Sequence, residues 1–443
     1  MKYTGLQLRL QSLRVKHARN KPVRKLLMAA RLIAELSGLL ARNGMRYTTR
    51  WLLLRYGPAS KDYGKSRLLL ASLLNTWIAK RGRTFLEIAD VSKLPEDRSS
   101  ILYELDQALK NFPDSLDLEY DECLDFYHYF LFFDDLRIAA RFRELTTRII
   151  LREQEACSHL LPEALKAALE LGRAETVLQW LEDKNPAIVD TELREAIAAH
   201  AHTLTGNRTA ALRYWEKKYS PADQKYADYL RCKSIAIVGP APPEGEPGPE
   251  IDSFDIVIRT NFNSSKPPDA RLFGSRTDVS YYNHSTMQQT PVTISNAAGF
   301  LDWVNLKVPD TGFESQESSS PKPEGTRSFF VPENIFQLGY PNAIPCILYD
   351  LLAFEPRSIK LFGVNFFTSA NAYSAHYAPS SGDNNSQNLS TAIRQHDPFS
   401  QLNFVVSHSR SNQVLADDLS GEILALNMST YAERLHYTYN LPK

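Results

Sequence analysis

The chain has 443 residues, of which 43% are hydrophobic and 23% are charged, and these values exclude a long disordered chain and a collagen-like repeat. This length exceeds what one hydrophobic core usually serves, so we expect two or three domains. Lysine plus arginine and aspartate plus glutamate each total 51, and this neutral balance argues against a general nucleic-acid binder.

Residues 1–55 form a strongly basic segment in a chain that is neutral overall. They contain 13 lysine and arginine residues against one acid, Glu35, so the rest of the chain is acidic. Apolar residues recur at three and four positions over Leu26–Leu40 and predict an amphipathic helix. We therefore expect residues 1–55 to contact an anionic surface, such as the lipid headgroups of a membrane. A solvated basic face of a helix bundle, or a contact with an acidic partner subunit, would leave the same pattern.

The early apolar run does not predict a membrane-spanning helix. Leu26–Leu40 is 15 residues long and includes Arg31 and Glu35, so it is too short and too charged to cross a bilayer. The first residues lack the apolar centre of a signal peptide. The four cysteines are scattered, which suits a reducing compartment. We expect a cytoplasmic protein, with a peripheral contact on the cytoplasmic face of the membrane as an option.

Residues 56–231 are predicted to form an all-α domain. Glycine is scarce there, whereas alanine, leucine, glutamate and arginine are abundant. The spacing of apolar stretches is similar to that of stacked helix pairs in tetratricopeptide repeats, but an irregular helix bundle fits it equally. The predicted helices cover Ile101–Asn111, Ala164–Leu171, Ala174–Leu181 and Glu192–Thr203.

Residues 232–443 differ in composition and predict an α/β domain with a mostly parallel, Rossmann-like sheet. Short β-branched runs alternate there with helical stretches. The polar segments Asp310–Gly325 and Tyr373–Gln395 are predicted loops, and the second is a candidate lid. The predicted strands are Lys233–Gly239, Asp255–Arg259, Asp278–Asn283, Ser328–Val331 and Ser358–Val364, with a helix at Asn342–Phe354.

The loop after the first predicted strand differs from common nucleotide-binding turns. Gly239 is followed by PAPPEGEPGPE, which is not G-x-G-x-x-G, and its prolines disfavour a helix N-terminus. The sequence also lacks a P-loop, an HExxH motif and a nucleophile elbow. A nicotinamide cofactor is therefore disfavoured.

An ordered set of short motifs runs through the predicted α/β domain. In chain order they are Gly239, EIDSFDIVIRTNFN from Glu250, FGSRTDVSYYN from Phe273, PNAIPCILYDLLAF from Pro341, SIKLFGVNFF from Ser358, AHY from Ala375 and QHDPFSQLNF from Gln395.

This set resembles the sialyltransferases of glycosyltransferase family 29 over residues 232–406. Glu250–Thr277 resembles the large sialylmotif of that family, and Pro341–Phe366 resembles the small one. AHY, with His376, is similar to motif III, and His396 is similar to the histidine of the very short motif.

The resemblance implies a GT-A-like variant of the Rossmann fold and a CMP-activated sugar donor, used without a metal or another cofactor. Amides, hydroxyls and backbone N–H groups can hold phosphate, ribose and cytosine by hydrogen bonds. For Arg276 a structural ion pair, and for Asn263 a turn position, are the alternatives to a donor contact. The donor-binding residues that the resemblance implies are Gly239, Asn261, Asn263, Ser275, Arg276 and Thr277.

The resemblance also implies which residues carry out the transfer. His396 would be the general base, because an imidazole that titrates near neutrality can take the proton of the acceptor hydroxyl. His376 would contact the departing phosphate, with Tyr377 or Tyr282 sharing that task. Asn342 is expected to cap the helix that follows it and to direct the helix N-terminus toward the phosphate, although capping alone would explain this residue.

Three positions depart from the family pattern. Pro240 stands where the family has a nucleotide-binding asparagine, PNAI at Asn342 replaces the usual Ser/Thr and Gly, and Gln401 replaces an acid. Asp397 could then orient His396 in place of that acid. The family's disulfide has no counterpart here, which agrees with a reducing compartment.

Asp278 directly follows Ser-Arg-Thr and has three interpretations. Kdo and sialic acid are both CMP-activated 2-keto-3-deoxy acids, and Kdo transferases related to this superfamily retain the anomeric configuration, which a carboxylate nucleophile would explain. Asp278 is therefore that nucleophile, a residue that shapes the pocket, or a turn residue at the start of a strand.

These features together predict a metal-independent glycosyltransferase. It would move an acidic sugar, sialic acid first and Kdo second, from a CMP donor to a hydroxyl of a glycan or glycolipid acceptor in bacterial surface glycan synthesis, with no nucleic-acid partner. The alternative is a catalytically inactive helical-repeat binding or assembly protein with a transferase-like domain, which the departures at Pro240, Asn342 and Gln401 would favour. The sequence leaves open the donor, the acceptor, the linkage, the stereochemical course and the oligomeric state.

Overall fold

The computed structural model describes residues 120–132, 136–153, 160–183, 189–283, 291–307, 325–329, 335–369, 393 and 396–440. All of them belong to one compact unit, which comprises Thr84–Asp90 and Asp97–Lys443. The predicted basic segment 1–55 lies outside the described residues, as do the predicted all-α domain before residue 120 and the predicted lid apart from Ile393. Within the described ranges, every helix is too short or too polar to span a bilayer.

The described strands form one all-parallel sheet, which confirms the predicted α/β, Rossmann-like class. Their order is β5-β4-β3-β2-β1-β6-β7, so the chain moves outward from β1 to β5 and then returns to the other side of β1. The direction of winding therefore reverses between β1 and β6. The strands are β1 (Ser234–Val238), β2 (Ile256–Thr260), β3 (Val279–Tyr282), β4 (Trp303–Lys307), β5 (Thr326–Phe329), β6 (Ser358–Phe362) and β7 (Leu415–Ala416).

The central strands are buried because their sequences are apolar on both faces. β1 is SIAIV and β2 is IVIRT, and Ile235, Ile237 and Val257 are fully buried. Ile235 pairs in register with Ile256 on one side and with Ile359 on the other. Such continuous apolar runs are typical of parallel strands that helices cover on both sides.

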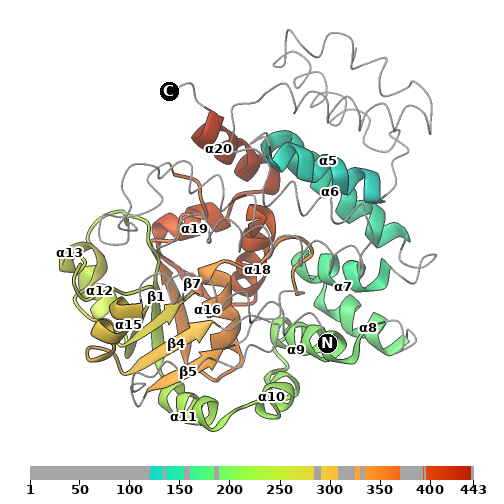
Figure 1. Ribbon diagram of the computed structural model, residues 1–443. Coiled ribbons are helices and arrows are strands. Elements are labelled where there is room, and N and C mark those ends of the chain that lie inside the picture. Colours follow the sequence, from blue (N-terminus) through green and yellow to red (C-terminus); the bar gives the residue numbers. More distant parts are fainter. Residues whose placement is uncertain are drawn as a thin grey trace, which may run out of the picture. The chain divides into compact units, whose positions relative to one another are not determined.

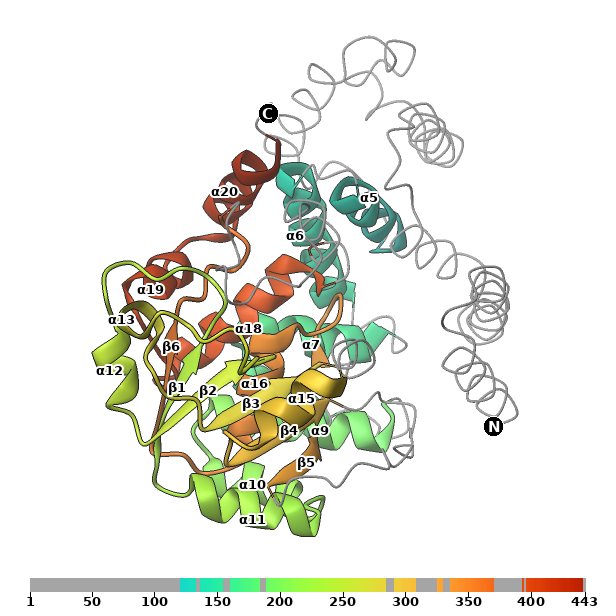
Figure 2. The ribbon, with the colours of Figure 1, turned by 60° about the vertical axis from the view of Figure 1, so that its left-hand side comes forward.

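Helices cover both faces of the sheet (Figures 1 and 2). Ile251 and Phe273 pack on one face, and Ala297 packs on the same face further along the sheet. On the opposite face, the hydroxyl of Tyr281 donates a hydrogen bond to Asp350, 2.6 Å away. The helices of this half are α12 (Gly248–Asp252), α13 (Ala270–Phe273), α15 (Pro291–Ala298), α16 (Ala343–Leu352), α18 (Pro398–Arg410), α19 (Asp418–Leu424) and α20 (Met428–Asn440).

The described residues before the sheet form helices, three of which coincide with predicted ones at 164–171, 174–181 and 192–203. Leu165, Val177 and Ile197 belong to one buried cluster that joins these three helices. The helices are α5 (Tyr120–Phe132), α6 (Leu136–Glu153), α7 (Leu161–Glu170), α8 (Ala174–Asp183), α9 (Thr191–Leu204), α10 (Arg208–Glu216) and α11 (Pro221–Leu230).

Side-chain contacts join these helices to the sheet half. An Nη atom of Arg208 donates to the backbone carbonyl of Phe354 at 2.6 Å, and the hydroxyls of Tyr226 and Tyr281 lie 3.2 Å apart. The predicted boundary at residues 231 and 232 falls between α11 and β1. It therefore marks a change in secondary structure that buried contacts cross.

Two strands of the sheet, β4 and β7, are not among those predicted from the sequence. β4 has the sequence WVNLK, and its polar Asn305 and Lys307 obscure the strand pattern. β7 is only two residues long. The strand predicted at Ser328–Val331 is present as β5, which begins two residues earlier, at Thr326.

Candidate functional site

The chain leaves both β1 and β6 at the carboxyl edge of the sheet with a glycine. The amide of Gly239 donates to the carbonyl of Phe362 at 2.7 Å, and the amide of Ala241 donates to the carbonyl of Gly363 at 3.1 Å. A Cβ atom on Gly239 would collide with the Gly363 carbonyl oxygen, so glycine is required by this close approach. Ligands of open α/β sheets bind at the carboxyl ends of the strands, where the winding reverses.

A hollow opens beside this reversal, at the carboxyl ends of β1 and β2. Three residues implied by the family resemblance, Gly239, Asn261 and Asn263, contribute to its wall. The lining residues of this β1–β2 hollow are Val238, Gly239, Arg259, Thr260, Asn261, Phe262, Asn263, Lys266 and Pro268.

Both asparagines in the wall shape the loop after β2. Asn261 has a φ of 49°, a left-handed conformation that asparagine adopts more readily than most residues. Its Oδ1 atom accepts from the Asn283 amide at 3.3 Å. The Oδ1 atom of Asn263 accepts from the amide and the hydroxyl of Ser265, at 3.0 and 2.7 Å. The turn role considered for Asn263 is therefore present in the structure.

Arg259 is a lining residue of the β1–β2 hollow, and its side chain carries a buried positive charge. This side chain is 4% exposed. Its Nε atom donates to the hydroxyl of Thr277 at 2.9 Å, and one Nη atom donates to backbone carbonyls of the loop 273–276. Asp252 and Asp278 act on it only at longer range. Burial lowers the pKa of Arg259 to about 10, so the group remains cationic at neutral pH.

Two polar atoms of the wall residues lack a partner in the described part of the chain. They are the second Nη atom of Arg259 and the hydroxyl of Thr260, and both are buried. Burying a donor without a partner costs about 1–3 kcal/mol, so such groups usually have a role. No carboxylate of the described residues hydrogen-bonds to this guanidinium, and a cation of this kind favours an anionic ligand nearby.

The structure places Ser275 and Arg276 outside the β1–β2 hollow. The carboxylate of Asp252 accepts from the amide and hydroxyl of Ser275, each at 2.8 Å, and from the amide of Arg276 at 3.1 Å. The guanidinium of Arg276 donates to carbonyls of residues 252–255 and lies 3.0 Å from the carboxylate of Asp278. These contacts fasten the loop before β3 and include an ion pair, but the Arg276 side chain is 42% exposed, so the pair is not the buried one considered for this residue.

Asp278 stands at the amino end of β3, and Thr277 lies next to it. The carboxylate of Asp278 accepts from the amide of Val257 at 2.7 Å, and the amide of Asp278 donates back to the carbonyl of Val257 at 2.9 Å. These bonds match a residue that starts a strand. The structure brings neither Asp278 nor Thr277 to the wall of the β1–β2 hollow.

Tyr282 is buried beneath the loop after β2. Its hydroxyl donates to the carbonyl of Phe262 at 2.8 Å, and burial raises the pKa of this hydroxyl to about 12. This hydrogen bond holds the backbone of Phe262, a residue that lines the β1–β2 hollow. His376 and Tyr377 lie outside the described residues.

His396 is half-buried just before α18, and its ring is oriented by a backbone group. The Nδ1 atom lies 2.8 Å from the carbonyl oxygen of Tyr340. Because a carbonyl only accepts, Nδ1 carries the hydrogen, and the neutral ring keeps the lone pair of Nε2. Burial lowers the pKa of His396 and Lys307 lowers it further, whereas the bond to Tyr340 raises it. The net shift is downward, so the ring is neutral at pH 7.

Gln401, at the position where the resembling family has an acid, contacts the backbone around His396 and not its ring. Its side-chain nitrogen donates to the carbonyls of His396 and Tyr340, and its Oε1 atom accepts from the amide of Asn342 at 2.8 Å. Gln401 therefore ties the turn before α16 to the turn before α18. Both helices begin at the same carboxyl edge of the sheet as the β1–β2 hollow.

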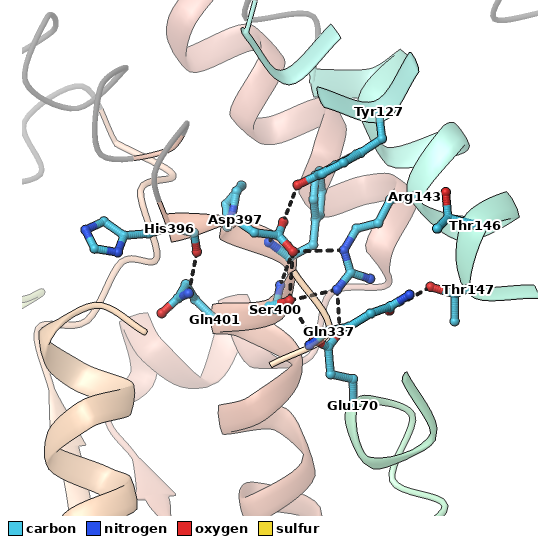
Figure 3. Close-up of polar contacts among 12 residues, drawn as sticks. Tyr127, Arg143, Thr146, Thr147, Glu170, Gln337, His396, Asp397, Ser400 and Gln401 are labelled. Carbon is cyan, nitrogen blue, oxygen red and sulfur yellow. Dashed lines mark hydrogen bonds and ion pairs between the residues drawn. The ribbon is translucent and has the colours of Figure 1, made fainter. Parts of the chain in front are cut away.

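Two expectations about this region are wrong in detail. Asn342 is the N-cap residue of α16, but its side chain makes no capping bond. Its Oδ1 atom is buried and has no partner among the described residues. The carboxylate of Asp397 is not the hydrogen-bond partner of the His396 ring, whose Nδ1 atom faces a backbone carbonyl. This carboxylate caps α18 and contacts Tyr127 and Arg143 instead (Figure 3).

The chain matches no protein-family model and no curated protein. In the described part of the chain, no group of three or more His, Cys, Asp or Glu side chains is placed to share a metal ion. The geometry and chemistry of the residues themselves therefore carry the functional argument.

Three residues of this region are not among the site residues predicted from the sequence: Arg259, Tyr340 and Lys307. A charged residue inside the apolar strand IVIRT is a signal that could have identified Arg259. Tyr340 acts through its backbone carbonyl, and Lys307 acts through proximity to His396. Their side-chain identities give no signal for these roles.

Proposed function

We propose that this protein is a glycosyltransferase that moves an acidic 2-keto-3-deoxy sugar from a CMP-activated donor to a saccharide hydroxyl. Sialic acid is the first candidate sugar and Kdo the second. The α/β half would then be a GT-A-like variant of the sialyltransferase fold. The acceptor would be a glycan or glycolipid of a bacterial surface.

The observation that carries this proposal is the buried cation of Arg259, a lining residue of the β1–β2 hollow. A CMP-sugar carries a phosphate and a sugar carboxylate, and both are stabilised by a positive charge that no carboxylate of the described residues contacts directly. Asn261 and Asn263 present amides at the same wall, which suits the neutral ribose and cytosine. The sialylmotif-like order of Glu250–Thr277 adds independent support from the sequence.

His396 supplies the base that the reaction requires. In the proposed step Nε2 takes the proton of the acceptor hydroxyl, and that oxygen attacks the anomeric carbon of the sugar. The bond from the anomeric carbon to the phosphate oxygen breaks, and CMP leaves with the electron pair. Stabilisation of this leaving group is assigned to the positive potential of Arg259, and to His376 by resemblance.

The cellular setting belongs to the same proposal. A basic segment such as residues 1–55 gains about 1 kcal/mol for each cation held near an anionic lipid surface. It would hold the protein on the cytoplasmic face of a membrane, where a lipid-linked acceptor is assembled. No metal ion or other cofactor is required by the groups assigned above.

The test is release of CMP when the full chain is mixed with CMP-sialic acid or with CMP-Kdo and saccharide acceptors. We expect release from one of the two donors, and a His396→Ala variant that binds CMP normally but turns over about a hundred-fold to ten-thousand-fold more slowly. Binding of CMP without release from either donor would favour the inactive assembly protein. Absence of CMP binding would overturn the proposal.

A further inference from the structure

The first helices of the described chain meet the start of α18 at a buried polar cluster. Its members come from α5, α6, α7 and α18, and each side chain lies within hydrogen-bond distance of another member (Figure 3). We call this group the anchor cluster. It consists of Tyr127, Arg143, Glu170, Asp397 and Ser400.

The carboxylate of Asp397 is the centre of the anchor cluster, and all its contacts are internal. It is 2% exposed. One oxygen accepts from the hydroxyl of Tyr127 at 2.7 Å and from the amide of Phe399 at 3.2 Å. The other accepts from Nε of Arg143 at 3.1 Å, from the hydroxyl of Ser400 at 2.7 Å and from the amide of Ser400 at 3.3 Å. Two of these five hydrogen bonds come from residues more than 250 positions earlier in the chain.

Glu170 completes the cluster from α7. It pairs with an Nη atom of Arg143, and its Oε1 atom lies 2.6 Å from the hydroxyl oxygen of Ser400, so the two carboxylates of the cluster share the one hydrogen of this hydroxyl. The same oxygen accepts from the amide of Gln337 at 2.8 Å. Gln337 lies three residues before Tyr340, so the cluster also holds the segment that carries the ring partner of His396.

The backbone of Asp397 links the anchor cluster to His396, the preceding residue. Asp397 has a φ of 33°, a conformation that non-glycine residues adopt only when their surroundings impose it. Gly339 packs against this point so closely that a Cβ atom there would lie 2.8 Å from Asp397 and 2.9 Å from the carbonyl carbon of His396. A shift of Asp397 would therefore move His396 relative to the Tyr340 carbonyl.

We propose that Tyr127, Arg143 and Asp397 are positioning residues for His396, so that the helices before the sheet hold the base of the site in place. This inference rests on the proposed function for the role of His396, but the placement itself can be measured without it. A buried carboxylate is tolerated only where its partners are in position. The turn before α18 therefore takes the observed form only while α5 and α6 supply those partners.

The first test observes the ring of His396 directly. The full chain, labelled with ¹⁵N-histidine, is titrated by NMR, and the signal is assigned with His396→Gln. We expect the wild-type ring to hold its hydrogen on Nδ1. In Tyr127→Phe, which removes one hydrogen bond at almost constant shape, we expect a mixture of Nδ1–H and Nε2–H forms and a pKa closer to the ordinary value. Asp397→Asn should have a larger effect.

A matched control separates positioning from general loss of stability. Tyr281→Phe removes another buried tyrosine–aspartate bond, that between Tyr281 and Asp350, in a cluster that does not touch the turn before α18. We expect this variant to leave the His396 tautomer and titration unchanged. The proposal is overturned if Tyr127→Phe keeps the wild-type tautomer and titration, or if Tyr281→Phe changes them equally. Tyr127→Phe decides the question even if Asp397→Asn does not fold.

The second test measures turnover of the sugar donor. Its outcome does not depend on the outcome of the NMR titration. With an active donor, Tyr127→Phe should lower kcat about ten-fold, leave the KM for the donor unchanged and move the acidic limb of the pH profile. Tyr281→Phe should leave all three unchanged. If the protein turns over no CMP-sugar, the proposed function fails while the NMR titration still reports on the anchor cluster. An unchanged kcat in Tyr127→Phe with an active donor would overturn the positioning role.

Discussion

The Nδ1 atom of His396 and the carbonyl oxygen of Tyr340 lie 2.8 Å apart, and this contact determines which ring nitrogen can accept a proton. In the sialyltransferases that the sequence resembles, an acid is expected to orient this histidine. Gln401 occupies the position of that acid in this chain. A backbone carbonyl orients the ring without adding negative charge near it. A carboxylate partner would raise the pKa of an imidazole, whereas here burial and Lys307 produce a net lowering.

The first prediction concerns the acidic limb of the pH profile. If neutral His396 is the base, kcat should fall on acidification with a midpoint below 6.5, the ordinary pKa of histidine. Lys307→Gln removes a positive charge that lowers the pKa of His396, so the midpoint should move upward. Lys218→Gln, a change at a lysine that pairs with Glu192, should leave the midpoint in place. The same midpoint in Lys307→Gln and in the wild type would contradict this account.

The second prediction concerns stability at acid pH. The rings of His200 and His408 stack between α9 and α18 with their Nε2 atoms 3.1 Å apart. Burial lowers the pKa of both rings, that of His408 to about 4. The unfolded chain then binds more protons than the folded protein between pH 6.5 and 4. The contribution of the two neutral rings to the free energy of unfolding is therefore fully present above pH 6.5, and it is lost as the pH falls through this window.

For His408 alone, the loss between pH 7.5 and pH 5 should be about 2 kcal/mol in the free energy of unfolding. Urea unfolding at several pH values measures it. His408→Gln should flatten the dependence, and His436→Gln, outside the pair, should preserve it. Equal slopes in His408→Gln and the wild type would show that other groups cause the acid loss.

The sequence pattern predicts the fold where burial is uniform and fails where polar residues are buried by distant partners. SIAIV and IVIRT are apolar and β-branched, so β1 and β2 follow from composition alone. β4 contains Asn305, which is fully buried because Tyr226 and Arg327 contact its side chain. Those partners come from α11 and β5, and a single sequence does not indicate their proximity.

The same limit applies to the site. Gly239, Asn261 and Asn263 follow strands, so their position at the carboxyl edge could be predicted from the order of elements. Ser275 and Arg276 belong to the same motif but return to the other end of the strand, where they hold Asp252. Motif membership therefore does not distinguish residues that line the hollow from residues that shape its loop.

The third prediction compares a buried and an exposed ion pair. Arg327 and Asp350 form two contacts, at 2.6 and 2.9 Å, and both side chains are almost completely buried. Asp350→Asn removes one of the two carboxylates that contact the guanidinium, since Asp223 still lies 2.7 Å from it, and should cost about 1.5–3 kcal/mol in the free energy of unfolding. Glu422→Gln breaks the exposed pair with Arg434 and should cost less than about 1 kcal/mol. Denaturant unfolding decides, and similar costs for both variants would contradict the burial argument.

The fourth prediction tests the close approach of β1 and β6 at the reversal. In Gly239→Ala, the new methyl group would meet the carbonyl of Gly363 and the side chain of Val364. The two turns must then separate, and overpacking of this kind costs about 1–3 kcal/mol. Because Gly239 also lines the β1–β2 hollow, CMP should bind more weakly in this variant, measured by isothermal titration calorimetry beside urea unfolding.

Gly299→Ala is the matched control for Gly239→Ala, because a Cβ atom at Gly299 would meet no atom within 4 Å. It should bind CMP as the wild type does and unfold at a similar urea concentration. Gly239→Ala and Gly299→Ala then differ only in what the added methyl group contacts. If both variants keep the wild-type affinity for CMP while Gly239→Ala loses stability, the reversal between β1 and β6 is a packing feature and the nucleotide binds elsewhere.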